Sequence, residues 1–389
     1  MTENKDTKTI GKTSVEIKEI STREDLKLFA DYPNKLYKDV DQHVPAFLGD
    51  DIEDWIPEKN PAFEYCEGKC FLAYRNGEIV GRIGAILSHK ANEKWGTKRM
   101  RFSQVDFIDD KEVSEALFNA VENWAREKGC DQVHGPLGFC DMDKEGMLVE
   151  GFEHRSMMIT YYNHPYYNDH LASLGYVKDT DWVENRFRIP DADSDTCKLL
   201  SKLSQRALRN GKYRKLDIKS NKDLTPEMVH KVFELLNIAY APLYGVVEVN
   251  ENQIKRIGAK FIPFVDPRLI SLVVDDEDNL VAFGLCLPSM SEALKKCRGR
   301  MFPTGWLRLL WALKHNDTLD LYLIAVVPEL QSKGLNAVVM DHILQGAISM
   351  GLKWVETGPT LETNSKVQSQ WKLFERQQHK RRRCYIKNI

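Results

Sequence analysis

The stretch LDLYLIAVVPELQSKGLNAVVMDHIL, residues 319–344, decides the fold of this chain. Its first part is almost continuously apolar up to Val327 and predicts a buried strand, whereas the apolar residues after Gly334 recur at helical spacing. The first N–H groups of a helix have no partner within it. Together with the helix dipole they bind diphosphate oxygens, and glycine lets the ligand approach the backbone. The stretch therefore predicts a strand-turn-helix corner that binds a diphosphate; the alternative is an ordinary corner that happens to contain a glycine.

A similar pattern lies in the first half of the chain, and this repeat predicts two copies of one structural unit. In each copy an amphipathic helix ends at a glycine, and a short strand then runs to a Gly-Pro turn. The corresponding residues are 113–125, Gly129 and Gly135-Pro136 in the first copy, and 335–347, Gly351 and Gly358-Pro359 in the second.

Each copy also has a hairpin upstream and a helix followed by a strand downstream. The first hairpin contains Asn76-Gly77, which favours a type I′ turn because both residues tolerate positive φ. The expected segments are hairpins at 70–87 and 269–287, helices at 166–176 and 366–378, and final strands at 182–189 and 382–389. A polar break at 190–196 and a short helix at 197–211 join the two copies.

The composition is that of a globular protein with two cores. At 389 residues the chain exceeds what one core usually serves. A net charge of -2 with 42% hydrophobic residues gives no reason to expect nucleic acid as a partner. The polar N-terminus, residues 1–14, lacks the apolar core of a signal peptide, and no apolar run reaches the roughly 20 residues that a membrane span needs. These features predict a cytoplasmic location.

The cysteine pattern argues against disulfides and against zinc. Eight cysteines are scattered along the chain, which predicts reduced thiols. Cys66 and Cys70 are close together, but no second Cys or His pair at zinc-ribbon spacing accompanies them. We therefore expect no metal site.

The order strand, helix, hairpin, strand, helix, strand, helix, strand resembles the GNAT N-acyltransferase superfamily, over residues 15–189 and again over 216–389. The resemblance implies an α/β (α+β) protein of two tandem GNAT folds, each a mixed, mostly antiparallel central sheet flanked by helices. Residues 319–344 resemble the acyl-CoA signature of the family, Gln-x-x-Gly-x-small, and imply acyl-CoA as co-substrate. The residues implied to bind it are Ala325, Val326, Val327, Gln331, Ser332, Lys333, Gly334, Leu335 and Asn336.

The first copy lacks this signature. Its helix begins after Asp109, Asp110 and Glu112 without a glycine, and carboxylates at a helix start would repel a diphosphate. We therefore expect an N-terminal GNAT-like domain over 1–190 without a working CoA site, which is structural or helps enclose the acceptor. A linker helix within 191–214 and a C-terminal GNAT domain with the acyl-CoA motif over 215–389 follow.

Catalysis needs a base for the attacking amine, donors for the oxyanion and an acid for the leaving thiolate. Glu356, on the strand after the CoA helix, and Glu362 with Asn364, just past the Gly358-Pro359 corner, are the candidates; the alternative is that they are solvated polar groups. The family often has a tyrosine in its last helix as general acid. Trp371 stands at that position, Phe374 lies close by, and Tyr385 is a distant substitute.

The sequence also resembles a bacterial group of double-GNAT proteins that share the VVPE-Q-x-K-G and LE-x-N segments, the latter at Leu361, Glu362 and Asn364. Relatives of that group N-acylate long-chain amino lipids, including in ceramide formation. The resemblance implies an acyl-CoA-dependent N-acyltransferase whose amine acceptor is long-chain or lipid-like. Two alternatives stay open. One is a Fem-like transferase that takes aminoacyl groups from tRNA, disfavoured because no long helical hairpin is inserted; the other is a scaffold without activity.

Three further segments need an interpretation. His164 and Asp169 have the His-x4-Asp spacing of glycerolipid acyltransferases, but a turn with a packed aromatic pair is the expected reading. Residues 299–316 are apolar with basic neighbours and predict a peripheral membrane contact, the wall of an acyl channel or a buried helix. The basic run at 380–383 fits an anionic surface or an exposed last strand.

Overall fold

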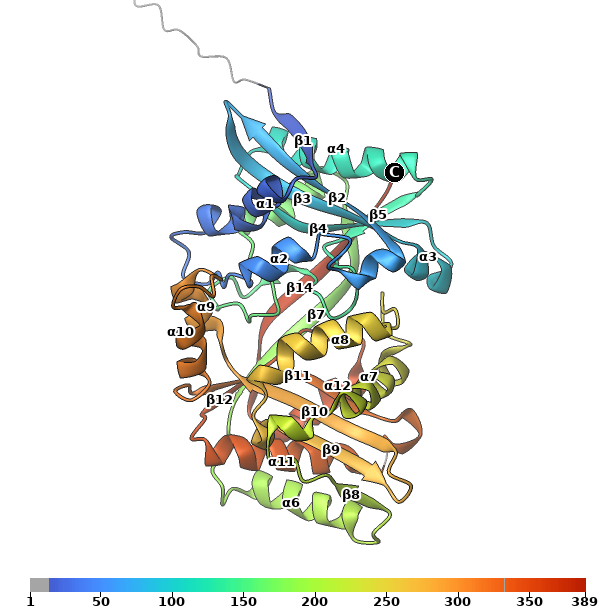
Figure 1. Ribbon diagram of the computed structural model, residues 1–389, viewed down its shortest axis with the longest axis vertical. Coiled ribbons are helices and arrows are strands. Elements are labelled where there is room, and N and C mark those ends of the chain that lie inside the picture. Colours follow the sequence, from blue (N-terminus) through green and yellow to red (C-terminus); the bar gives the residue numbers. More distant parts are fainter. Residues whose placement is uncertain (1–13, 332) are drawn as a thin grey trace, which may run out of the picture.

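One twisted sheet of 14 strands runs through the part of the chain that the computed structural model describes, residues 14–331 and 333–389. The polar N-terminal residues 1–13 and Ser332 lie outside this part. Figure 1 shows the N-terminal half of the chain in the upper part of the molecule and the C-terminal half in the lower part. Both halves have helices on the two faces of the sheet, so the expected α/β architecture of two tandem units is present.

The element order of the N-terminal half follows the expected one. Its strands and helices are β1 (Glu16–Ile20), α1 (Arg23–Leu36), α2 (Leu48–Glu53), β2 (Cys66–Arg75), β3 (Glu78–Ser88), α3 (His89–Trp95), β4 (Arg99–Phe107), α4 (Lys111–Glu127), β5 (Gln132–Gly135), β6 (Met147–Glu150), α5 (Tyr166–Ser173) and β7 (Val177–Arg188). Asn76 and Gly77 both have positive φ, at 54° and 79°, which confirms the type I′ turn between β2 and β3.

The C-terminal half repeats that order after a connecting helix. Its elements are α6 (Asp195–Leu208), β8 (Tyr213–Lys215), α7 (Pro226–Tyr240), α8 (Glu251–Phe261), β9 (Ile270–Asp275), β10 (Leu280–Pro288), α9 (Ser291–Cys297), α10 (Gly305–Ala312), β11 (Thr318–Val326), α11 (Leu335–Ser349), β12 (Trp354–Thr357), β13 (Thr360–Leu361), α12 (Ser365–Gln370) and β14 (Arg376–Asn388). Gly129 and Gly351 follow α4 and α11 with positive φ, as expected for glycines that end helices.

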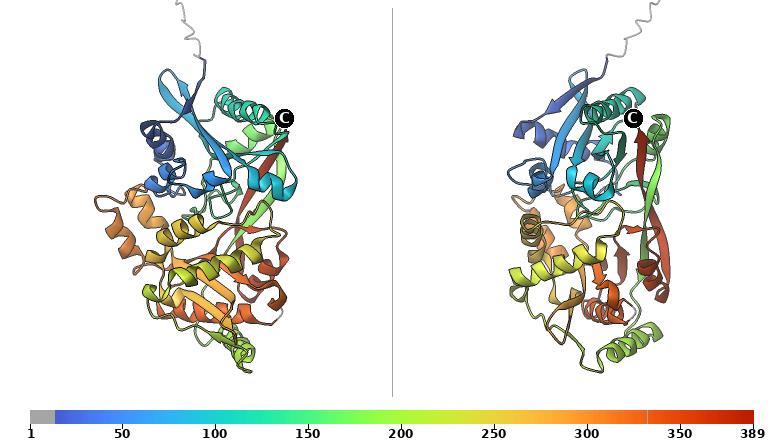
Figure 2. Two further views of the ribbon diagram at one scale, coloured as in Figure 1. Left: turned by 45° about the vertical axis from the view of Figure 1, so that its right-hand side comes forward. Right: turned by 90° about the vertical axis from the view of Figure 1, so that its right-hand side faces the viewer.

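The two final strands cross between the halves. The strand order is β1-β2-β3-β4-β5-β14-β7-β12-β11-β10-β9-β8, so β14 of the C-terminal half lies between β5 and β7 of the N-terminal half. β7 in turn pairs with β12 of the C-terminal half. Figures 1 and 2 show these two long strands running side by side between the upper and lower parts. Each half therefore depends on the other to complete its sheet.

The strand exchange explains two departures from the sequence expectations. The helix expected over 366–378 ends at Gln370, with a 3-10 turn at Trp371–Leu373, because Gln377 and Gln378 pair with β7. The basic run 380–383 is not an exposed strand or an anionic-surface patch. Lys380 and Arg382 are 1% and 0% exposed and form ion pairs with the buried Glu184 of β7, at 3.0 and 2.5 Å.

Helices on opposite faces of the C-terminal sheet enclose two apolar cores. α11 and α6 pack together on one face, where Phe187, Leu319 and Val355 are buried beneath α11. α7 packs on the other face, over β10 and β11. All eight cysteines are free thiols, as expected. In the described residues, no helix is both long enough and apolar enough to cross a membrane.

Candidate functional site

Residues 319–344 form the strand-turn-helix corner that their sequence predicts. β11 ends at Val326, a 3-10 turn spans Pro328–Leu330, and Gly334 immediately precedes α11. Gly334 has a φ of 80°, a conformation that favours glycine. A Cβ built on it would meet only Ala207 Cβ within 4 Å, at 3.7 Å, so the backbone at the helix start is open to a ligand.

The other predicted CoA-binding residues frame this corner. Ala325, Val326 and Val327 end the strand, Gln331 and Lys333 are exposed in the turn, and Leu335 and Asn336 begin the helix. Lys366 of α12 donates a hydrogen bond of 2.8 Å to Oε1 of Gln331. Two lysines, Lys333 and Lys366, therefore lie at the corner beside the positive end of the helix dipole, a combination that favours an anionic ligand.

A β-bulge interrupts β11 at Tyr322. Leu323 lies opposite Leu285 of β10, and Leu321 lies opposite the next residue, Cys286, so Tyr322 has no partner residue on β10. A bulge places two successive side chains on one face of the sheet. Tyr322 and Leu323 accordingly both belong to the core under α7 rather than the one under α11.

The parallel strands β11 and β12 separate at the same point. Their pairing ends with Leu321 and Thr357, and the Gly358 N–H still donates to the Leu321 carbonyl oxygen at 2.9 Å. The chain then turns away at Pro359 while β11 continues to Val326. Because of the bulge and the separation, the sheet has a gap between β11 and β12. This gap lies between the corner at Gly334 and the face of the sheet under α7.

A cavity of about 200 Å³ opens at this gap. Its walls are mostly apolar and come from β10, β11, α7, α8 and the Gly358-Pro359 corner; they include Leu285, Leu323, Val232, Phe233, Ile257 and Phe261. Tyr322 also lines the cavity. Its hydroxyl oxygen is buried and has no hydrogen-bond partner among the described residues. A buried polar atom without a partner carries a free-energy cost unless a ligand or water satisfies it.

The N-terminal half contributes three carboxyl groups to this cavity. Asp141, Asp143 and Glu145 belong to the loop that follows β5 and lie among its lining residues. Asp143 accepts hydrogen bonds from the N–H groups of Phe139 and Cys140, at 2.8 and 3.1 Å, so it braces the loop. Burial raises the pKa of Asp141 to about 6 and raises the pKa of Glu145 well above its usual value, with Asp141 adding to that shift.

The corresponding corner of the N-terminal half is occupied by side chains. Asp110 caps α4 by accepting a hydrogen bond from the Glu112 N–H, and Arg75 forms ion pairs with both carboxylates, at 2.5 and 2.6 Å. His170 lies 3.0 Å from Asp109. These groups lie at the start of α4, the position that corresponds to Gly334 at the start of α11, and the lack of a CoA site in this half stays a prediction.

The chain is similar in fold and in sequence to known proteins. The searched family models give no match. The tandem GNAT protein from the clavulanic acid biosynthesis pathway superposes with a TM-score of 0.55 at 12% identity, covering 96% of this chain and 98% of that one. The protein has a tandem GNAT fold. Among curated sequences, Protein YghO of Escherichia coli is 26% identical over 382 residues, 94% of each chain. Bacterial ceramide synthase of Caulobacter vibrioides is 29% identical over 359 residues, 90% of this chain and 91% of that one.

Within the tandem GNAT fold, the three predicted catalytic residues lie in different surroundings. Glu356 of β12 lines a second, larger cavity of about 860 Å³ and lies 2.9 Å from His379 Nε2. Burial opposes ionisation of Glu356, but Lys380 and His379 outweigh it and lower its pKa. Glu362 is exposed and paired with Lys178 and Arg381, and Asn364 caps α12 through the Val367 N–H.

Trp371, which stands where the family often has its general-acid tyrosine, and Tyr385, the distant substitute, both lie in cores. Trp371 is 1% exposed and packs beside Phe187 beneath α11. Tyr385 lies in the core of the N-terminal half, where its hydroxyl donates to Asn168 Oδ1 at 2.8 Å. Tyr322 is the tyrosine at the gap. Tyr322 is not among the site residues predicted above from the sequence. A tyrosine in an otherwise aliphatic strand, two residues after Asp320, is the feature that could have pointed to it.

The His-x4-Asp segment forms a turn and a helix start with packed aromatic rings. The His164 ring stacks on Tyr166 at 5.3 Å between centroids, while Asp169 is exposed on α5. Tyr167 stacks on Phe107 at 4.1 Å. This environment fits the aromatic-turn interpretation rather than a histidine base held by a carboxylate.

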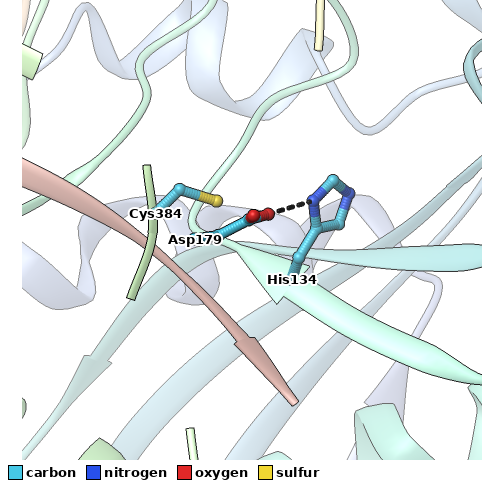
Figure 3. Close-up of side chains that lie close together, drawn as sticks. All are labelled: His134, Asp179 and Cys384. Carbon is cyan, nitrogen blue, oxygen red and sulfur yellow. Dashed lines mark ion pairs between the residues drawn. The ribbon is translucent and has the colours of Figure 1, made fainter. Parts of the chain in front are cut away.

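One cluster of potential metal ligands occurs in the described residues: His134, Asp179 and Cys384 (Figure 3). The Tyr244 hydroxyl donates to Asp179 and lies 3.0 Å from His134 Nδ1 and 3.5 Å from Cys384 Sγ, so it occupies the space among the three ligand atoms. Burial raises the pKa of the Cys384 thiol and lowers that of His134 to about 4. Hydrogen bonds among His134, Asp179, Cys384 and Tyr244 account for this cluster, and the absence of a metal stays a prediction.

Proposed function

We propose that this protein is an acyl-CoA-dependent N-acyltransferase that acts on an amine acceptor with a long hydrocarbon chain. The observation that carries the proposal is the corner at Gly334, where α11 begins without a cap from any described side chain, next to the gap between β11 and β12. The similarity to a protein named bacterial ceramide synthase over 90% of this chain supports a lipid-like acceptor. We also propose a cytoplasmic location and a division of the chain into an N-terminal domain (1–190), a linker (191–214) and a C-terminal domain (215–389).

The residues proposed to hold CoA have distinct roles. The N–H groups at Leu335 and Asn336 would bind the diphosphate, and Lys333 would add positive charge. The end of β11, from Ala325 to Val327, would offer backbone groups to the pantetheine arm. Gln331 keeps the turn in place through Lys366. The thioester would then lie at the bulge, beside the cavity.

For the predicted catalytic residues, the surroundings support different roles. Glu356 stays part of the proposal as an ionised carboxylate, because Lys380 and His379 lower its pKa. Glu362 and Asn364 remain part of the proposal, although each already serves a structural contact. In this proposal the N-terminal half encloses the acceptor and binds no CoA.

A transfer assay tests the function. Purified protein with a long-chain acyl-CoA and a long-chain primary amine is expected to release CoA thiol only when the amine is present, and mass spectrometry should detect the amide. Thiol release without an amine would indicate hydrolysis and contradict the proposal. The absence of CoA binding would favour the scaffold alternative, and retention on tRNA with no CoA binding would favour the Fem-like one.

We also propose that α10 contacts a membrane surface peripherally, within residues 299–316. Phe302, Trp306, Leu307, Leu310 and Trp311 are 41–83% exposed, although Leu309 on the same helix is fully buried. Arg308 and Lys314 flank them, and among the described residues neither has an ion-pair partner. Exposed apolar side chains with basic neighbours are typical of helices that lie on anionic lipids.

Replacing Trp306 and Leu310 by Ser should therefore weaken co-sedimentation with vesicles of anionic phospholipid by at least about tenfold, because each side chain gains about 1.5–3 kcal/mol when buried. The matched control is Leu199→Ser with Leu203→Ser, an exposed leucine pair at the same spacing on α6. Equal binding of both double variants and the wild type would contradict this contact.

A further inference from the structure

The loop after β5 brings acidic side chains of one half into the apolar cavity of the other half. Asp141 and Glu145 come from the N-terminal half, whereas Tyr322 and Leu323 come from β11. Among the described residues, neither Asp141 nor Glu145 forms a hydrogen bond or an ion pair with another side chain. Asp143, between them, is satisfied by backbone N–H groups. The two free carboxyl groups are therefore available to a ligand.

We propose that Asp141 and Glu145 bind the amine of the acceptor in this cavity, and that Asp141 accepts its proton before the amine attacks the thioester. The inference rests on the proposed function and names the residues that would bind its long-chain amine acceptor. Its cationic end meets the carboxyl groups, and its hydrocarbon chain lies along the apolar walls. Tyr322 lines the same cavity, and its buried hydroxyl has no hydrogen-bond partner among the described residues, so a polar group is left unsatisfied at this place independently of the two carboxyl groups.

The size of the space fits such an acceptor. A third cavity, of about 340 Å³, adjoins the 200 Å³ cavity that contains Asp141 and Glu145. The walls that these two cavities share are Met142, Asp143, Ile159, Ile257 and Phe261. The third cavity is also rich in apolar side chains, among them Phe47, Phe139, Met158 and Phe264. Both exceed many times the roughly 30 Å³ that one water occupies in the liquid. Movement of the shared side chains would join them into one channel between the halves.

Burial and the surrounding charges set the pKa of Asp141. Burial raises it, Asp143 raises it further, and Arg101 of β4 and Lys94 of α3 lower it, with a result of about 6. Tyr240 of α7 also faces it. Glu145 has its pKa raised well above the usual value by burial and by Asp141. With a pKa of about 6, Asp141 is ionised at neutral pH and is suited to accept a proton.

The proposed transfer consists of one deprotonation and one nucleophilic attack. The ammonium of the acceptor gives one proton to the Asp141 carboxylate, and the neutral nitrogen attacks the thioester carbonyl carbon. The C–N bond forms and the C–S bond breaks. The remaining surplus proton on nitrogen passes to the departing sulfur, which yields the amide and CoA thiol, and Asp141 releases its proton to water.

A binding experiment tests the amine site without requiring turnover. By isothermal titration in detergent micelles, a long-chain primary amine is expected to bind at least about tenfold more tightly than the alcohol of equal chain length, because the ammonium pairs with a desolvated carboxylate. Asp141→Asn should remove this preference, and Asp276→Asn, in the exposed turn between β9 and β10, should keep it. Equal affinity of the wild type for amine and alcohol would overturn the inference even if acyl transfer is observed.

Kinetics provide the second test. The kcat/KM of the wild type should rise with pH through about 6 and then level off, because Asp141 must be ionised. Asp141→Asn should lower kcat by about 100-fold or more and abolish that rise, with CoA affinity unchanged. Glu145→Gln should raise KM for the amine. An Asp141→Asn protein with wild-type kcat and pH profile would overturn the inference while leaving the acyltransferase function intact. If the wild type transfers no acyl group, the proposed function fails instead.

Discussion

Gly334→Glu is expected to abolish measurable CoA binding. The substitution puts a carboxylate beside the N–H groups at Leu335 and Asn336, where the diphosphate would bind. At about 4 Å, in surroundings of effective dielectric near 20, two like charges repel by about 4 kcal/mol. We therefore expect the affinity for CoA, measured by isothermal titration, to fall by two orders of magnitude or more.

Gly334→Ala separates the charge effect from backbone strain. Alanine adopts the same positive φ of 80° with similar difficulty, and its Cβ would lie 3.7 Å from Ala207 Cβ without a clash. Since Ala carries no charge, its loss of affinity should be much smaller than that of Glu, while both variants should lose similar thermal stability. Comparable CoA affinity in the Glu variant and the wild type would show that the ligand does not use this helix start.

Glu184→Gln is expected to destabilise the whole protein by about 3–5 kcal/mol. Glu184 is fully buried and is paired with Lys380 and Arg382 of the exchanged strand β14. The neutral side chain would leave the buried Arg382 without its counter-charge and Lys380 with only Glu356, 3.7 Å away, which costs far more than the loss of an exposed pair. Urea denaturation followed by fluorescence should report the change in the free energy of unfolding.

The control and the pH dependence make this prediction specific. Glu150→Gln removes an exposed partner of Arg381 on the same strand and should change stability by about 0.5 kcal/mol or less. Burial disfavours the Glu184 anion, but Arg382 and Lys380 outweigh it and lower its pKa to about 2, from a usual value of 4.5. The stabilisation is therefore complete above about 4.5 and is lost as pH falls toward 2. Glu184→Gln should lack that part of the acid-induced loss; an identical pH profile would contradict the assignment.

The parts of the fold that follow local rules could be predicted from the sequence. Asn76-Gly77 predicts its turn because the required positive φ is a property of those two residues. The corner at Gly334 could be found because a buried strand, a glycine and an amphipathic helix follow one another directly. The element order of both halves follows from the same local signals.

The remaining features depend on contacts between residues far apart in the chain. The strand exchange follows from pairing of β14 with β5 and β7, and no local pattern distinguishes this from two separate sheets. The sequence around 380 and 382 is that of a surface segment, and only the pairing with Glu184, which is distant in sequence, buries these two basic residues. Asp141 and Glu145 have the composition of a polar loop, and only the packing of the N-terminal half against α7 places them in a cavity. Of the predicted site residues, Glu362 and Asn364 have contacts that account for them without catalysis.

The central claim is that the N–H groups that begin α11 bind the diphosphate of CoA, and amide hydrogen exchange tests it most directly. Mass spectrometry of peptides covering residues 328–340, with and without saturating CoA, reports on the turn and the helix start. We predict that CoA slows exchange in these peptides and leaves the corresponding α4 start, with Asp110 and Glu112, unchanged. CoA binding with no protection at residues 328–340, or with protection at the α4 start instead, would contradict the account.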